Sequence, residues 1–145
     1  KRLGMLPKHY IAIHLRASDV DLDFRSFLNH VKPQLKGCDV LVCTDSLKAL
    51  NASLNILDES TTHQVATIPD TGGVRIHDNP KHTTRSTNLD AIADLIALAR
   101  AEQIIYPFGP NIHTSGFAQL AIDLSNRKDL LRQLVGYNYW EGLGR

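Results

Sequence analysis

Cysteine is scarce in this sequence. Cys38 and Cys43 are the two cysteines among 145 residues, too few for a disulfide-stabilised scaffold or a structural zinc site. An excess of one charge is also missing, because 16 Lys+Arg against 15 Asp+Glu leave a net charge of +1. Such a balance predicts neither a nucleic acid nor an anionic membrane as partner. The uncharged runs are far shorter than the roughly 18 apolar residues of a membrane-spanning helix.

The remaining composition is that of an ordinary globular protein. Hydrophobic residues make up 43% of the chain, which sets aside disordered, collagen-like and coiled-coil classes. This length predicts a single domain over residues 1–145, burying roughly 68–70% of its unfolded surface. The first residue is Lys rather than Met, so we expect a fragment or a processed product. Few cysteines and no visible signal peptide favour a cytoplasmic, bacterial setting.

Short apolar runs alternate with longer segments of helical period along the chain. The pattern predicts strands over 10–15, 39–43, 65–68 and 103–108, and helices over 23–35, 46–54, 88–101, 114–126 and 128–135. Pro33 should limit the first helix, and Thr87 with Asn88 should begin the third. The alternation favours an α/β fold, a doubly wound, mostly parallel sheet with helices on both faces. In such sheets, ligands bind beyond the carboxyl ends of the strands.

Polar side chains gather where the predicted strands end. They follow the first and second strands, and they open the helix after the fourth; a long loop over 71–86 adds basic residues. A helix N-terminus, a guanidinium held by the sheet and a cationic loop on one edge suit a phosphate or diphosphate ligand. The strand-end candidates are His14, Arg16, Asp19, Asp45, Thr114, Ser115 and Phe117.

Arg16 and Asp45 each have two interpretations. Arg16 either aims its guanidinium over the strand end toward a ligand, or pairs at the surface with Asp19 or Asp45. Asp45 either accepts from a ligand or orients Arg16. Alternatively, Asp45 or Ser46 serves only as the N-cap of the next helix, where Asp and Ser are both preferred.

Other carboxylates have competing explanations. Asp90 and Asp94 share one stripe of a helix, and like charges at that spacing repel by a few tenths of a kcal/mol unless a donor or solvent faces them. The helix dipole explains Asp90, whereas Asp94 could accept N–H groups from a purine base. The Asp-x-Asp spacing of Asp19, Asp21 and Asp23 is like that of metal-dependent glycosyltransferases, but helix capping accounts for it. The histidines show no metal-ligand spacing, so no metal site is predicted.

Three segments together resemble the GDP-fucose-dependent fucosyltransferases. They are YIAIHLRASD, VLVCTDS and DLIALARAEQIIYPFGPNIHTSGFAQLA, which are similar to the three consecutive motifs of the α1,6-, nodulation and protein O-fucosyltransferases. The resemblance covers about residues 10 to 125. It implies the Rossmann-like, donor-binding half of a two-domain GT-B glycosyltransferase, which transfers fucose from GDP-fucose to a glycan or protein acceptor without a metal ion or other cofactor.

The resemblance also implies roles for individual residues. Arg16 would bind the β-phosphate and stabilise the departing diphosphate, with His14 and Asp19 in the same motif. Asp45 would order the donor site and Asp94 would lie near the guanine. Thr114, Ser115 and Phe117 would line the phosphate and sugar pocket. Ala17 and the Thr114–Ser115 pair depart from the pattern of some family members, which have a second basic residue and tandem serines there.

In the family that the sequence resembles, the acceptor-binding half is a separate N-terminal domain, which we expect to be missing from these 145 residues.

The sequence also leaves two rival functions. The chain could instead be a non-catalytic member of the same fold, serving as a scaffold or as a carbohydrate- or nucleotide-binding module. A dinucleotide-binding domain of an oxidoreductase is disfavoured, because no G-x-G-x-x-G follows the first strand.

Overall fold

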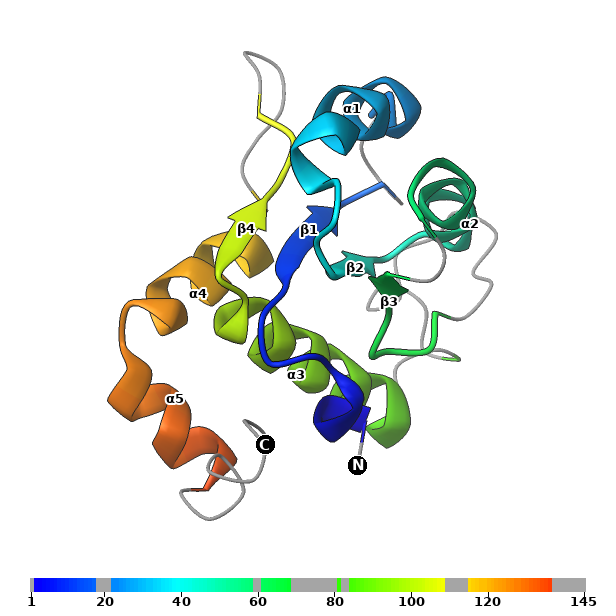
Figure 1. Cartoon of the computed structure of the whole chain (residues 1–145). Helices are drawn as coiled ribbons and strands as arrows, with labels where there is room; N and C mark the ends of the chain where they lie inside the picture. The colour runs from blue at the N-terminus through cyan, green and yellow to red at the C-terminus, as the bar shows by residue number, and fades with distance from the viewer. Residues whose placement is uncertain are drawn as a thin grey trace.

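A computed structural model describes residues 2–17, 22–58, 61–68, 81, 84–108 and 115–136. Strands and helices alternate along the chain, and Figure 1 shows the strands enclosed between helices. The strands are β1 (Ile11–Leu15), β2 (Val40–Thr44), β3 (Thr62–His63) and β4 (Gln103–Ile105). The helices are η1 (Arg2–Met5), α1 (Phe24–Val31), η2 (Lys32–Leu35), α2 (Leu47–Ile56), α3 (Arg85–Arg100), α4 (Gly116–Ser125) and α5 (Lys128–Val135), with η marking 3₁₀ geometry.

The described strands form one parallel sheet in the order β3-β2-β1-β4. The chain adds β2 and then β3 on one side of β1, and afterwards places β4 on the other side. The predicted α/β, Rossmann-like architecture is therefore confirmed. The reversal of strand order falls between β1 and β4, and open α/β sheets bind ligands outside the carboxyl ends of the strands at such a point.

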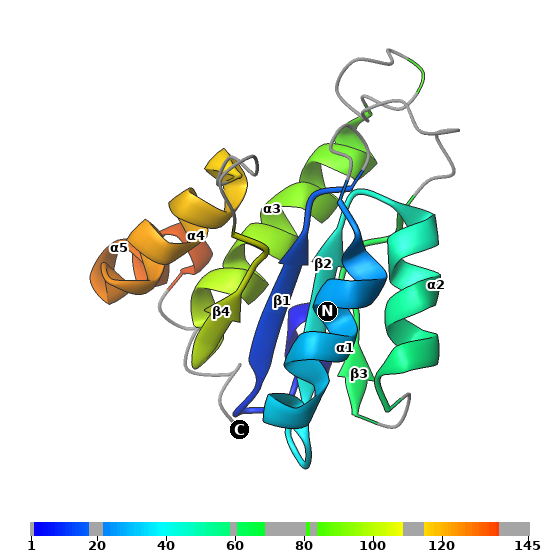
Figure 2. The ribbon, with the colours of Figure 1, turned by 90° about the horizontal axis from the view of Figure 1, so that it is seen from above.

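Helices cover both faces of the sheet. Figure 2 shows α1 and α2 on one face, and α3, α4 and α5 on the other. Alternate residues of each strand point to opposite faces, so Ile13 and Val42 pack in the core beneath α1 and α2, whereas Ala12 and Cys43 pack in the core beneath α3 and α4. His14 is two residues after Ala12 and pairs in register with Cys43. The period of the strand therefore directs His14 to the face of α3 and α4.

Two predicted strands differ from the structure. The third strand was expected over 65–68, but β3 is the polar pair Thr62–His63, which aligns with Val40 and Leu41 of β2. The backbone N–H of Ala66 is donated to the Asp94 carboxylate rather than to a neighbouring strand. The fourth strand ends at Ile105 rather than at 108, just before Pro107, which has no N–H to donate.

The helix boundaries also need correction. The third helix begins one turn earlier than predicted, because Thr84, and not Thr87, is its N-cap: each hydroxyl accepts from the other residue's backbone N–H. The first helix keeps α geometry only to Val31 and continues as η2 through Pro33. Ser46, not Asp45, caps α2. Helix α5 spans 128–135 as predicted.

Candidate functional site

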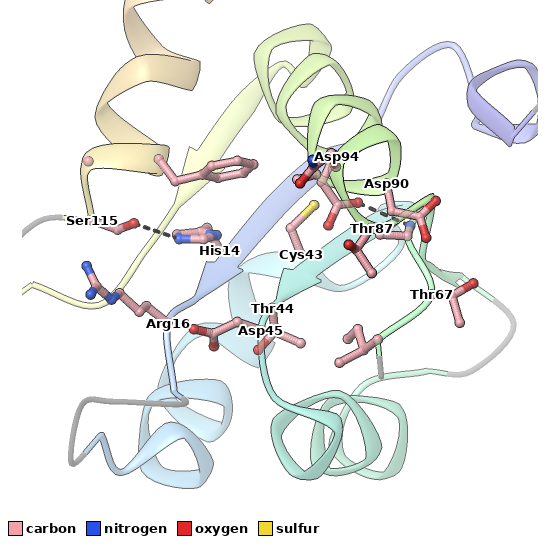
Figure 3. Close-up of a pocket in the computed structure, with 16 residues that line it drawn as sticks. His14, Arg16, Cys43, Thr44, Asp45, Thr67, Thr87, Asp90, Asp94 and Ser115 are labelled. Atoms are coloured by element: carbon pink, nitrogen blue, oxygen red, sulfur yellow. Dashed lines mark hydrogen bonds between the residues drawn. The ribbon is translucent and has the colours of Figure 1, made fainter. Parts of the chain in front are cut away.

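One pocket of about 470 Å³ lies at the carboxyl edge of the sheet. Its walls are the ends of β1 and β2, the segment after β3, the first half of α3 and the start of α4 (Figure 3). This is the edge where the topology places ligands. A volume of roughly 300–1,000 Å³ is the usual size of a small-molecule site.

Six of the eight sequence-predicted site residues line this pocket. Asp19 and Thr114 lie outside the described residues. Residues from four different segments, separated by up to about a hundred positions, are therefore brought to one place, although their roles stay predictions. The six are His14, Arg16, Asp45, Asp94, Ser115 and Phe117.

His14 forms the floor of the pocket at the β1–β4 switch point. Its side chain is buried, its ring is stacked on Phe117 with centroids 5.6 Å apart, and its Nε2 lies 3.1 Å from the Ser115 Oγ. Burial lowers the pKa of His14 to about 4; the nearby Asp45 opposes this shift and Arg16 reinforces it. Nδ1 has no hydrogen-bond partner of good geometry among the described residues, although the Cys43 backbone lies close enough to raise the pKa by a lesser amount. His14 is thus a neutral imidazole near pH 7.

Asp45 ties the end of β2 to the end of β1. Its Oδ1 accepts from the backbone N–H of Ala17 at 2.8 Å, while Ser46 performs the capping of α2 by accepting from Ala49. The interpretation of Asp45 as the cap residue is therefore wrong. The bond to Ala17 fixes the backbone next to Arg16, which agrees with the alternative in which Asp45 orients that residue.

Arg16 directly follows the last residue of β1. The segment 18–21, which comes shortly after it, lies outside the described residues. Figure 3 shows the Asp45 carboxylate turned toward the end of β1, and the Arg16 side chain extending from there toward the side on which Ser115 lies. Arg16 is half-buried and lines the same pocket as Ser115. Its positive charge also lowers the pKa of His14, and the cation therefore borders the same pocket as the start of α4.

Asp94 occupies the opposite end of the pocket, where α3 crosses the sheet. Its side chain is 9% exposed, and Oδ1 accepts from the Ala66 N–H at 3.2 Å. Burial, together with the charge of Asp94 and a hydrogen bond to it, raises the pKa of the Cys43 thiol well above its usual value. Asp94 therefore anchors the segment after β3 to α3, in addition to facing the pocket (Figure 3).

Several lining residues were not among the sequence candidates. Cys43 follows from strand period alone, because it pairs with His14 and shares its face. Asp90 lies one helical turn before Asp94 and is half-buried in the same wall. Its spacing from Asp94 is a sequence signal, but the helix dipole alone also accounts for an acidic residue near a helix start. Gly116 and the segment Ala66–Ile68 also line the pocket. Their sequence gives no sign of this, because glycine has no side chain and the apolar run over 65–68 predicts a strand.

The acidic residue Asp23 has a structural role. Its carboxylate accepts from the Ser26 N–H at 3.0 Å as the N-cap of α1, which confirms the capping interpretation for this member of the Asp-x-Asp series. Asp19 and Asp21 lie outside the described residues. Within the described ranges, no three His, Cys, Asp or Glu side chains gather in a way that would hold a metal ion. No helix in that part of the chain has both the length and the apolar character needed to cross a bilayer.

No family model, curated protein or solved structure matches this chain. The resemblance to fucosyltransferases therefore stays a prediction, and the case for function rests on the pocket itself.

Proposed function

We propose that this chain is the donor-nucleotide-binding domain of a metal-independent glycosyltransferase, with GDP-fucose as its most plausible donor. One observation carries the proposal: a single pocket joins a cation and a helix N-terminus at one end to two carboxylates at the other, of which Asp94 is buried and Asp90 half-buried. A nucleoside diphosphate has the matching distribution, with anionic oxygens at one end and base N–H groups at the other. The motif series in the sequence supports the same ligand.

The α4 end of the pocket suits the diphosphate. The first N–H groups of a helix have no intrahelical partner and carry partial positive charge, and Ser115 and Gly116 place them at the pocket wall. Arg16 adds a guanidinium, which binds phosphate oxygens bidentately. His14, buried and neutral, adds no charge of its own there.

The α3 end suits the base. Asp90 and Asp94 provide carboxylate oxygens, while Ala91 and Ile68 provide apolar surface against which a ring can lie. Carboxylates accept from the adjacent N–H groups of guanine but find no such pair on uracil or adenine. This end would therefore select the base, whereas the α4 end would bind any diphosphate.

The same groups would serve the transfer step. Breaking the bond between the sugar carbon and the β-phosphate oxygen leaves the electron pair, and hence negative charge, on the diphosphate. Arg16 and the N-terminus of α4, which are held by the fold before reaction, would stabilise that charge. Removing one such preorganised contact typically lowers the rate by about 10²–10³. The acceptor would bind to a separate domain in the two-domain architecture that we propose for the whole protein.

Calorimetric titration with GDP, UDP and ADP tests the binding proposal directly. We expect heat of binding with GDP, weaker binding of UDP and ADP, and competition between GDP and GDP-fucose. The absence of both heat and chemical-shift change with every nucleoside diphosphate would refute donor binding. Binding of all three with equal affinity would support a diphosphate site but refute selection of guanine.

A pair of matched variants tests the assigned cation. Arg16→Gln should weaken GDP binding at least tenfold, because a charge-assisted contact to a phosphate is lost. Arg25→Gln removes the same charge from an exposed position on α1, so it controls for a long-range effect of net charge. Equal affinities for the two variants would exclude Arg16 from the site.

The rival function, a non-catalytic binding module, makes a different prediction. Slow release of GDP and free sugar from GDP-fucose in water, lost in Arg16→Gln, would indicate a transferase. Tight GDP binding with no cleavage, even in the presence of fused or added acceptor domains, would favour the binding module.

A further inference from the structure

The N-terminus of α4 is not capped in the usual way. Ser115 occupies the N-cap position, where serine oxygen ordinarily accepts from the N–H of the second or third helical residue, yet its side chain forms no such bond. The three other helices that begin after a residue with a side-chain oxygen are all capped: α1 by Asp23, α2 by Ser46 and α3 by Thr84. The exception therefore needs a local cause.

His14 provides that cause. Its Nε2 lies 3.1 Å from the Ser115 Oγ, and with the serine side chain in this hydrogen-bonded orientation its oxygen caps no N–H group of α4. The ring itself has little freedom, because it is buried at 8% exposure and stacked on Phe117 with an angle of 28° between the planes. The partners are 101 positions apart in the chain, so only the folded sheet brings them together.

We propose that His14 is a positioning residue, which withholds the Ser115 hydroxyl from α4 so that the first-turn N–H groups of Phe117 and Ala118 are left to bind the anionic part of the ligand. The inference rests on the proposed nucleotide function for the identity of that anion, a diphosphate. It assigns His14 no contact with the ligand and no proton transfer. Its effect on binding passes entirely through Ser115.

The proposal has a consequence that a purely structural histidine would not have. Once Nε2 is removed, the Ser115 hydroxyl can rotate and cap α4, competing with the ligand for the same N–H groups. His14→Phe, which retains an aromatic ring beside Phe117, should therefore weaken anion binding. His14→Gln places an amide nitrogen close to the position of Nε2 and should restore it. In a Ser115→Ala background no hydroxyl remains to cap the helix, and the substitution at His14 should lose its effect.

Two measurements test the proposal. Without ligand, amide hydrogen exchange of Phe117 and Ala118 should slow by about fivefold in His14→Phe, the effect of one capping bond, and stay unchanged in His14→Gln. The His14→Phe variant should bind inorganic pyrophosphate and GDP about fivefold more weakly than the unchanged chain does. In the Ser115→Ala background, the same substitution should weaken binding by less than about twofold. His30→Gln, at an exposed position of α1, is the control for loss of an imidazole, and His14→Leu repeats the test if the Phe variant does not fold.

Unchanged exchange at Phe117 and Ala118 in a folded His14→Phe or His14→Leu chain would overturn the proposal. Additive losses of affinity from His14→Phe and Ser115→Ala would also overturn it, because they would indicate that His14 acts on the ligand independently. If pyrophosphate follows the expected pattern while GDP does not bind, the nucleotide proposal fails and the positioning role stands. If neither ligand binds, the anion-binding role of the α4 N-terminus is overturned together with the nucleotide proposal, and the exchange measurement reports only on the capping of α4.

Discussion

Acidification should destabilise the folded chain through His14. Burial lowers the pKa of this imidazole from 6.5 to about 4 in the folded state, whereas the unfolded chain titrates near the ordinary value. Between these two values the unfolded state binds the proton and the folded state does not. Stability therefore falls as the pH drops through this window, and the loss levels off once the folded state is protonated as well.

The magnitude follows from the two pKa values. A change from 6.5 to about 4 corresponds to on the order of 3 kcal/mol when the whole window is crossed. About 2 kcal/mol of this should already be lost between pH 7 and pH 5. His14 is only 8% exposed, so solvent screening reduces the effect little.

Urea unfolding at pH 7, 6 and 5 and constant ionic strength measures the loss. Other groups titrate in the same range, so the informative quantity is the difference between the unchanged chain and His14→Gln, which has no imidazole at this position. We expect the unchanged chain to lose about 2 kcal/mol more than the variant between pH 7 and pH 5. Parallel curves for the two chains, or an NMR titration of the His14 ring with a midpoint near 6.5, would refute the reasoning.

Three further substitutions test the contacts around the pocket. Asp45→Ala leaves the Ala17 N–H without its carboxylate acceptor, so urea unfolding should show a loss of about 1 kcal/mol and GDP titration a lower affinity; unchanged GDP affinity would contradict a role in orienting Arg16. Asp94→Ala removes the acceptor of the Ala66 N–H and should cost about 1–3 kcal/mol of stability, with Asp123→Ala on α4 as the exposed control; equal losses would refute the anchoring role. Gly116→Ala adds a methyl group that meets no atom within 4 Å, so the melting temperature should rise with about 0.4–1 kcal/mol of stability while GDP binds more weakly, and unchanged affinity would place the ligand away from α4.

The elements that the sequence predicted best are those whose local pattern and tertiary surroundings agree. Strands β1 and β2 are apolar except for His14 and Thr44 near their ends, and both faces of each strand are covered in the structure. Ser46 is a preferred cap residue, and it caps α2. The two-residue β3 could not be found in this way, because its Thr and His carry no apolar signal and its position is set by pairing with β2.

The sequence predicts where in the fold the candidate site lies, but it does not predict which contacts the site residues make with one another. Parallel topology alone puts the ends of β1, β2 and β4 on one edge, and six candidates chosen at strand ends and on α3 do line one pocket. The bond between His14 and Ser115 could not be predicted, because it depends on which side of β1 the chain places β4. The attachment of Ala66 to Asp94 was missed for a related reason: a side chain, rather than a strand, satisfies that backbone group.

The two ends of the pocket would bind different parts of a nucleoside diphosphate, and this difference bears on specificity. Asp94 is bonded to the wall that it supports, so changing it alters the shape of the base end as well as its charge. At the other end, the Ser115 hydroxyl is held by His14 and the helix it precedes is left uncapped. Substitutions at the α4 end should therefore weaken GDP, UDP and ADP by a common factor, since all three share the diphosphate. Substitutions at Asp90 should change their ranking instead, because a ratio of affinities depends only on the part of the ligand that differs.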